Sequence, residues 1–168
     1  MPRRLIVIRH AKSDWDAEVD SDHARVLNPR GRRACAAIGG WLADHGYLPD
    51  QVLCSDAART LETWQRLSAH LRKPPAPQLS DTLYLASAEA LLAAVKAAEG
   101  ACVAVIAHNP GIAAFASGMV AAAPTHDRFR AYPTLSTLVI DFNVATWSDV
   151  TPGSGNAVDF IVPRDLTG

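Results

Sequence analysis

Short, wholly apolar segments alternate with longer amphipathic ones over roughly the first 120 residues, and this alternation limits the possible folds. The short segments have the length and character of strands that are covered on both faces: "RLIVI" (4–8), "QVLC" (51–54) and "CVAVIA" (102–107). The longer segments have the apolar spacing of helices: residues 28–46, 56–71, 87–100 and 109–120. Such alternation is typical of parallel strands joined by crossover helices.

Two more strand-like segments, 134–144 and 156–162, follow a polar loop and are separated by the turn "TPGSG". The chain has 168 residues, which suits one domain, and it contains no internal repeat or linker. We therefore expect a single α/β domain over residues 1–168. It should be a three-layer α/β/α sandwich with a mostly parallel central sheet.

Local signals predict where several of these elements begin and end. Asn109 followed by Pro110 predicts a helix that begins with an asparagine cap, and Gly46 predicts the end of the helix over 28–46. Three prolines between positions 74 and 77 predict an irregular connection.

The composition excludes several classes of partner. Sixteen Lys and Arg residues against 17 Asp and Glu residues give a formal net charge of −1, so neither a nucleic acid nor a membrane surface is expected. Arg9 interrupts the apolar run near the N-terminus, which argues against a signal peptide. The three cysteines indicate no disulfide framework, so we expect a reducing, cytoplasmic location. The compact size and the absence of an obvious self-association stripe make a monomer the default expectation.

Reactive side chains follow each of the three predicted buried strands. Arg9 and His10 come after the first strand, Ser55 and Arg59 after the second, and His108 after the third. Because the carboxyl ends of parallel strands meet at one edge of a sheet, these two imidazoles and two guanidiniums should share a crevice. The remaining histidines lie in ordinary surface contexts: His23, His45, His70 and His126.

A cationic crevice in a nearly neutral protein suits a phosphoryl group. Arginine binds phosphoryl oxygens with two donors, and a neutral imidazole can attack phosphorus to form a phosphohistidine that water hydrolyses. Taken singly, each residue has a structural explanation; taken together, they predict phosphoryl transfer. The sequence shows neither metal-ligand spacing nor a glycine-rich phosphate loop, so no metal and no cofactor are expected.

The ordered motifs "RH" (9–10), "SDAART" (55–60) and "HNPG" (108–111) resemble the histidine phosphatase superfamily, which has the phosphoglycerate-mutase-like fold. Four further stretches resemble its SixA-type phosphohistidine phosphatases: "RHAKSDW" (9–15), "LNPRGRRA" (27–34), "LYLAS" (83–87) and "FIVPRDL" (160–166). The resemblance covers essentially the whole chain.

The resemblance implies a role for each matching residue. His10 would be the nucleophile, Arg9 and Arg59 would hold the phosphoryl oxygens, and His108 would donate to the phosphoryl group. Arg9 and Arg59 would also disfavour protonation of His10. Three further residues would line the pocket: Ser13, Asn28 and Asn109.

Two departures from the family pattern affect the expected substrate. Ala11 and Lys12 follow the "RH" motif where the wider superfamily has Gly and then Glu or Gln, which points away from the mutases. The glutamate that serves larger members as a proton donor has no clear equivalent, and Asp81, Tyr84 and Glu89 are the nearby candidates. Because imidazole leaves more easily than an alkoxide, a site without an acid favours a phosphoramidate substrate.

We therefore expect a phosphatase that acts on phosphohistidine in a partner protein, such as the phosphotransfer domain of a signalling relay. Phosphate or sulfate should also bind in the pocket. Two alternatives stay open at this point. One is a phosphatase of a small phosphoester with Asp81 or Glu89 as proton donor, and the other is a binding module without turnover.

Overall fold

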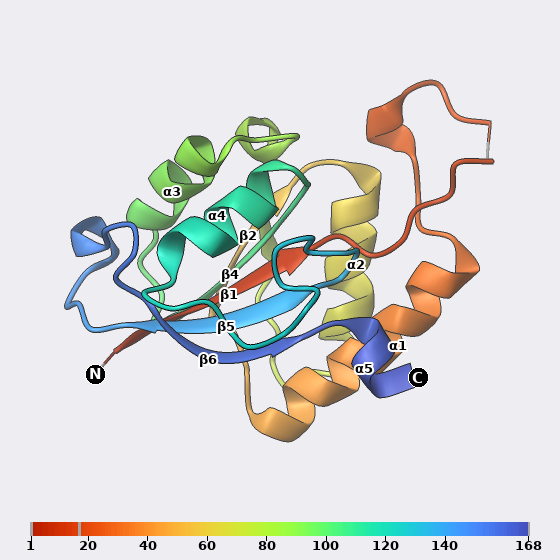
Figure 1. Cartoon of the computed structure of the whole chain (residues 1–168). Coiled ribbons are helices and arrows are strands. Elements are labelled where there is room, and N and C mark those ends of the chain that lie inside the picture. The colour runs from red at the N-terminus through yellow and green to blue at the C-terminus, as the bar shows by residue number, and fades with distance from the viewer. Residues whose placement is uncertain (1, 17, 168) are drawn as a thin grey trace.

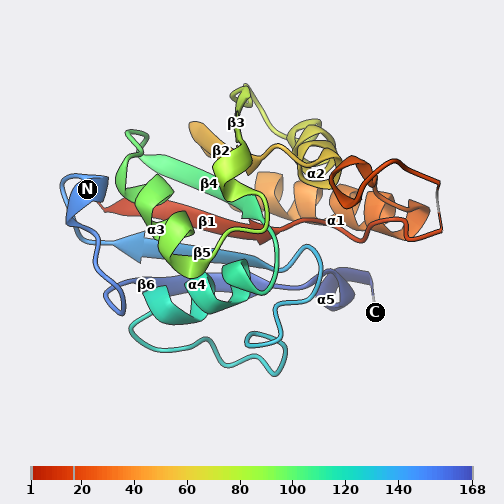
Figure 2. The same ribbon diagram turned by 90° about the horizontal axis from the view of Figure 1, so that it is seen from above.

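One mixed sheet passes through the molecule, with its six strands in the order β3–β2–β4–β1–β5–β6 (Figures 1 and 2). The computed structural model describes residues 2–16 and 18–167. The strands are β1 (Arg3–Arg9), β2 (Gln51–Ser55), β3 (Pro77–Ser80), β4 (Cys102–Ala107), β5 (Thr137–Phe142) and β6 (Asn156–Ile161). Pairing is parallel from β3 to β1, and it is antiparallel between β1 and β5 and between β5 and β6. The prediction of a mostly parallel sheet is therefore confirmed.

Helices cover both faces of this sheet. They are α1 (Pro29–His45), α2 (Ala58–Ser68), α3 (Ala88–Lys96), α4 (Gly111–Met119) and α5 (Pro163–Thr167). Figure 1 shows α3 and α4 on one side of the sheet and α1 and α5 on the other. The α/β/α layering expected from the sequence is confirmed. No helix in the described ranges is long and apolar enough to cross a membrane.

The central strand β1 explains why its sequence is wholly apolar. Leu5 and Val7 pack into the core under α3 and α4, whereas Ile6 and Ile8 pack into the core under α1 and α2. Successive side chains of a strand point to opposite faces, so a strand between two helical layers needs apolar residues at every position. The same requirement applies to β4, whose residues 103–107 are all buried.

Two sequence predictions about the connections were wrong. The proline-rich connection is not wholly irregular, because Pro77–Ser80 forms β3 and pairs with β2 at the edge of the sheet. An edge strand has one side without a partner, so it tolerates a residue that lacks an N–H group.

The predicted helix start at Asn109 was also wrong. Helix α4 begins at Gly111, its cap position is Pro110, and no side chain caps it. The Asn109 side-chain amide instead donates to the backbone carbonyls of Ala131 and Tyr132, at 3.2 and 3.1 Å. Asn109 thus ties the loop before β5 to the end of β4.

Gly111 provides a test of how closely the start of α4 packs against Ala86, in the segment before α3. A Cβ atom there would overlap the backbone carbonyl of Ala86, whereas nothing lies within 4 Å of a Cβ atom at Gly118. We predict that Gly111→Ala lowers the free energy of unfolding by about 1–3 kcal/mol because it overpacks this contact. Gly118→Ala, in the same helix, should raise it by up to about 1 kcal/mol. Urea denaturation of both variants measures the difference, and equal stability would contradict the packing described.

Candidate active site

The parallel pairing of β1 and β4 places two histidine side chains next to each other. Arg9 lies opposite Ala107 in the sheet, and the His10 N–H donates to the Ala107 carbonyl at 3.1 Å. His10 and His108 therefore leave adjacent strands at the same edge, and their ring centroids are 5.3 Å apart. The predicted meeting of strand ends is what the structure shows.

His10 is held in one tautomer by its own backbone. Its Nδ1 atom lies 2.7 Å from the carbonyl oxygen of Ala11. A carbonyl oxygen only accepts, so Nδ1 carries the hydrogen and the lone pair of the neutral ring is on Nε2. His10 is only 6% exposed. It thus presents an unprotonated Nε2 nitrogen, the atom that a nucleophilic imidazole needs.

Burial keeps the His10 ring neutral. Burial is the largest cause, and together with the neighbouring His108, Arg59 and Arg9 it lowers the pKa of His10 to about 3, although the bond to Ala11 opposes this shift. The two arginines, which the sequence predicts to disfavour protonation of His10, are thus a smaller cause than desolvation of the charged ring.

His108 is buried and forms a hydrogen bond with Ser55. Its Nε2 atom is 2.7 Å from the Ser55 hydroxyl oxygen, while its buried Nδ1 has no partner among the described residues. Burial and the Arg59 charge lower the pKa of His108 to about 3. Ser55 does not cap α2, whose cap position is Ala57 without a side-chain bond. The hydroxyl of Ser55 instead holds the second imidazole in place.

Two arginines bring positive charge to the histidine pair. Arg9 donates through Nη1 to the Tyr132 carbonyl at 3.2 Å, and Arg59 donates through Nη1 to the Asp22 carbonyl at 2.8 Å. The Nε atoms of both arginines are buried without a partner within the described ranges. Burial, followed by the charge of Arg59, lowers the pKa of Arg9. Buried donors without partners are suited to an anion.

A carboxylate that the sequence analysis missed lies against these groups. Asp22 accepts from Arg59 Nη2 at 3.0 Å, from Arg25 at 2.9 Å and from the Tyr84 hydroxyl at 2.5 Å. The bonds from Tyr84 and Arg25, and then the Arg59 charge and bond, hold the pKa of Asp22 well below its usual range. The crevice that the sequence predicts to be cationic therefore also contains one carboxylate, which is ionised. Asp22 lies in an acidic loop without a motif, and only the folded loop brings it to Arg59.

A cavity of about 610 Å³, called the active-site cavity below, lies at Arg9, His10, Arg59 and Asp22, whereas His108 and Ser55 are not among the residues that line it. It is lined by Arg9, His10, Lys12, Ser13, Trp15, Asp22, Arg25, Arg59, Leu85, Asn109, Pro133 and Thr134. Of the three additional lining residues that the resemblance implied, Ser13 and Asn109 lie here.

Other predicted residues lie outside the active-site cavity. Asn28 caps α1 by accepting from the Gly31 N–H at 2.8 Å, and it borders a neighbouring hollow. Asp81 and Glu89 are not among the lining residues, although Tyr84 reaches the site through Asp22. His23, expected to be an ordinary surface residue, packs edge-on against Tyr84 with ring centroids 4.9 Å apart.

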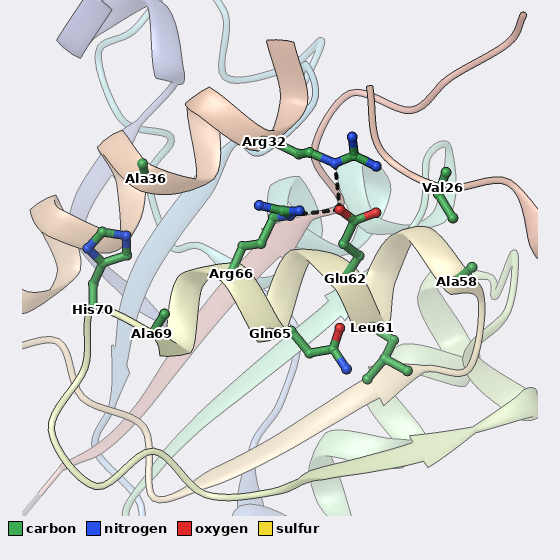
Figure 3. A pocket seen from close by; sticks show the side chains of 10 residues that line it. All are labelled: Val26, Arg32, Ala36, Ala58, Leu61, Glu62, Gln65, Arg66, Ala69 and His70. Atoms are coloured by element: carbon green, nitrogen blue, oxygen red, sulfur yellow. Dashed lines mark hydrogen bonds and ion pairs between the residues drawn. The ribbon is translucent and has the colours of Figure 1, made fainter. Parts of the chain in front are cut away.

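Another cavity, of about 700 Å³, lies between α1 and α2, and none of the predicted catalytic residues lines it (Figure 3). Glu62 lies at its centre and accepts from Arg32 at 2.8 Å and from Arg66 at 2.7 Å. Both guanidiniums are thus paired with the Glu62 carboxylate. Across residues 2–16 and 18–167, no group of three or more His, Cys, Asp or Glu side chains is arranged to hold a metal ion.

The chain is similar to known proteins in sequence and in fold. The model of the histidine phosphatase superfamily (branch 1) matches residues 5–83. An uncharacterised protein of Mycobacterium leprae is 30% identical over 167 residues, which cover 94% of this chain and all of that protein. An uncharacterised chloroplastic protein of Arabidopsis thaliana is 42% identical over 69 residues, which cover 41% of this chain and about a third of that protein.

Among solved structures, a proposed phosphohistidine phosphatase SixA from Nakamurella multipartitia superposes with a TM-score of 0.78. It is 28% identical, and the match covers 97% of each chain. Fold and site thus define an α/β protein of the phosphoglycerate-mutase-like class. Within that class, the chain belongs to the histidine phosphatase superfamily, and its resemblance to SixA proteins is confirmed.

The burial of the two histidines predicts how they titrate. With a folded-state pKa of about 3, His10 and His108 should stay neutral from pH 8 down to pH 5. The same rings in the urea-unfolded chain should titrate near pH 6.5. Histidine ring resonances followed by two-dimensional NMR against pH measure this directly. Protonation of the folded His10 near pH 6.5 would contradict the desolvated site.

The same difference in pKa links acid to stability. Between about pH 6.5 and pH 3 the unfolded chain binds protons that the folded His10 and His108 do not. We therefore predict that these two histidines make the protein less stable as the pH falls through this window, and have no such effect at pH 7. Thermal unfolding from pH 7 to pH 4 measures it, with His10→Asn as the comparison. A fall in melting temperature as steep in His10→Asn as in the wild type would contradict the assignment to His10.

Proposed function

We propose that residues 1–168 act as one histidine phosphatase domain that removes a phosphoryl group from phosphohistidine in a partner protein. The observation that carries this proposal is His10, a buried neutral imidazole with a free Nε2, beside two arginines and a second imidazole. A nucleophile and oxyanion donors are the parts that phosphoryl transfer needs.

In the first step, His10 Nε2 attacks phosphorus. The new N–P bond forms as the N–P bond of the substrate breaks, and the substrate's imidazole leaves. The His10 ring gains positive character in this step, and its Nδ1–H bond to the Ala11 carbonyl stabilises that charge. In the second step, water attacks the phosphorus atom on His10, and a P–O bond forms as the Nε2–P bond breaks. Both protons of the water leave with the phosphate as dihydrogen phosphate, and His10 returns to its neutral ring with the hydrogen on Nδ1.

Arg9, Arg59 and His108 would stabilise the charge on the phosphoryl oxygens. The free Nε–H groups of both arginines and the unpartnered His108 Nδ1 are the available groups. When the Ser55 hydroxyl donates to His108 Nε2, the neutral ring carries its hydrogen on Nδ1 and can donate to the phosphoryl group. The guanidiniums supply the positive charge, so we propose that no metal or organic cofactor takes part.

The acids around the site support a phosphohistidine substrate over a phosphoester. Asp22 lines the cavity, but its lowered pKa leaves it without a proton to give. Burial and the bond to Asp22 raise the pKa of Tyr84, so its phenol keeps its proton. An alkoxide leaving group without an acid would react roughly 10²–10⁴ times more slowly. An imidazole whose distant nitrogen is protonated leaves as a neutral molecule and avoids this loss.

The proposed substrate also indicates a class of partner protein and a cellular location. A phosphotransfer domain of a signalling relay presents phosphohistidine on a protein surface, and we propose it as the partner class. The proposal includes a cytoplasmic location and a monomeric protein. Three free cysteines, of which Cys35 and Cys54 are buried, are compatible with a reducing compartment.

The first functional test is phosphate release by variants of the site. We predict that His10→Ala lowers release from a phosphorylated phosphotransfer domain by at least about 10³-fold, because the nucleophile is lost. Arg59→Ala should raise the barrier by roughly 2–4 kcal/mol, the typical contribution of an oxyanion donor. His45→Ala is the matched control, because His45 is exposed at the end of α1 and lies outside the cavity.

The substrates tested separate this proposal from its alternatives. Fast release that depends on His10 and is confined to phosphohistidine supports it. Preference for a small phosphoester would contradict it and would require a proton donor from outside the cavity, such as Asp81 or Glu89. Saturable phosphate binding without any turnover would identify a binding module instead.

A further inference from the structure

A second cavity, of about 500 Å³, adjoins the active-site cavity and shares Lys12, Pro133 and Thr134 with it. We call it the basic groove, because five cationic side chains line it: Lys12, Arg30, Arg33, Arg128 and Arg164. No Asp or Glu is among the described residues that line it.

The cations of the basic groove come from separate parts of the chain. Arg30 and Arg33 belong to α1 and Arg164 belongs to α5, and these two helices lie side by side (Figure 1). Lys12 follows β1, and Arg128 lies in the loop between α4 and β5. The fold therefore gathers this charge at one place, although the protein as a whole has a formal net charge of −1.

No direct ion pair neutralises the cations of the basic groove within the part of the chain that the structure describes. All five side chains are exposed, and none of them has a hydrogen bond or ion pair with another described residue. Arg32, by contrast, is paired with Glu62 on the other side of α1. Of the nearby acids, Asp165 accepts from His126, and Asp14 and Asp16 line a separate hollow that also includes Lys12, Arg30 and Arg33.

We propose, on the basis of the phosphohistidine phosphatase function proposed above, that the basic groove docks an acidic face of the protein that carries the phosphohistidine. Because the groove shares Lys12, Pro133 and Thr134 with the active-site cavity, a protein bound there can present a side chain to His10. Complementary charge would speed the encounter and fix the orientation of the partner.

The character of the groove favours a protein surface over a small anion or a nucleic acid. Its cations are exposed, whereas a tight site for a small anion would use buried donors such as those of Arg9 and Arg59. Its lining includes Ala34, Val162 and Pro163, so apolar contacts lie among the arginines, as in protein interfaces. None of the lining residues is aromatic, so the described groove has no surface on which bases could stack.

Two exposed arginines allow a test that leaves the active-site cavity intact. Arg128 and Arg164 line the basic groove and neither the active-site cavity nor the hollow with Asp16. The double variant Arg128→Glu/Arg164→Glu reverses their charge, and Arg128→Lys/Arg164→Lys preserves it. Lys96→Glu is the control for charge reversal elsewhere, because Lys96 is exposed at the end of α3.

Phosphate release is measured with two substrates. One is free phosphohistidine, and the other is a phosphorylated phosphotransfer domain with acidic residues around its phosphohistidine. For the domain, we expect the glutamate variant to raise KM about tenfold or more at low salt, with kcat much less affected. The lysine variant and Lys96→Glu should stay within about twofold of the wild type. Added salt should raise the wild-type KM and reduce the difference between variants.

The outcomes distinguish this proposal from the function on which it rests. An unchanged KM for the domain in the glutamate variant would overturn docking in the basic groove while phosphatase activity stands. An equal loss with free phosphohistidine would also overturn it, because the arginines would then act on the active-site cavity. Competition by a single-stranded oligonucleotide through these arginines would identify a different occupant. Failure of the wild type to release phosphate from either substrate would instead contradict the proposed function.

Discussion

The hydrogen-bonded pairing of β1 with β4 is the interaction on which the candidate site depends. Arg9 lies opposite Ala107, so the first residues beyond the two strands, His10 and His108, emerge together at one edge of the sheet. A shift of one residue in this register would send one of the two side chains to the opposite face. The apolar cores on both faces stabilise this register, because Val7 packs in the core under α3 and α4 and Ile6 packs in the core under α1 and α2.

Burial at this edge gives the two imidazoles a role that exposed histidines would not have. Desolvation keeps both rings neutral, with a pKa of about 3, and the Ala11 carbonyl directs the lone pair of His10 to Nε2. Positive charge comes from Arg9 and Arg59, which do not lose their protons. The site therefore combines a neutral nucleophile with cationic oxyanion donors. Asp22 accepts hydrogen bonds from Nη1 and Nη2 of Arg59, through its carbonyl and its carboxylate.

Local sequence signals predicted the parts of the structure that depend on local pattern. The wholly apolar strands, the glycine that ends α1 and the reactive residues after the strands could all be found in this way. Side chains placed by long-range contacts could not. Asp22 reaches Arg59 across 37 residues, Asn109 bonds to a loop more than 20 residues away, and the basic groove joins both ends of the chain. Charge counted over the whole sequence hid that groove, because the average is close to zero.

The central claim is that the phosphoryl group passes through Nε2 of His10, and the most direct measurement is the chemical identity of the phosphorylated enzyme. The protein would be mixed with a phosphorylated phosphotransfer domain, quenched in alkali within the first turnover and examined by ³¹P NMR and peptide mass spectrometry. The account predicts phosphate on His10, bonded to Nε2, since Nδ1 is bonded to the Ala11 carbonyl. Phosphate on Nδ1 or on another residue, or release without a phosphorylated enzyme, would contradict it.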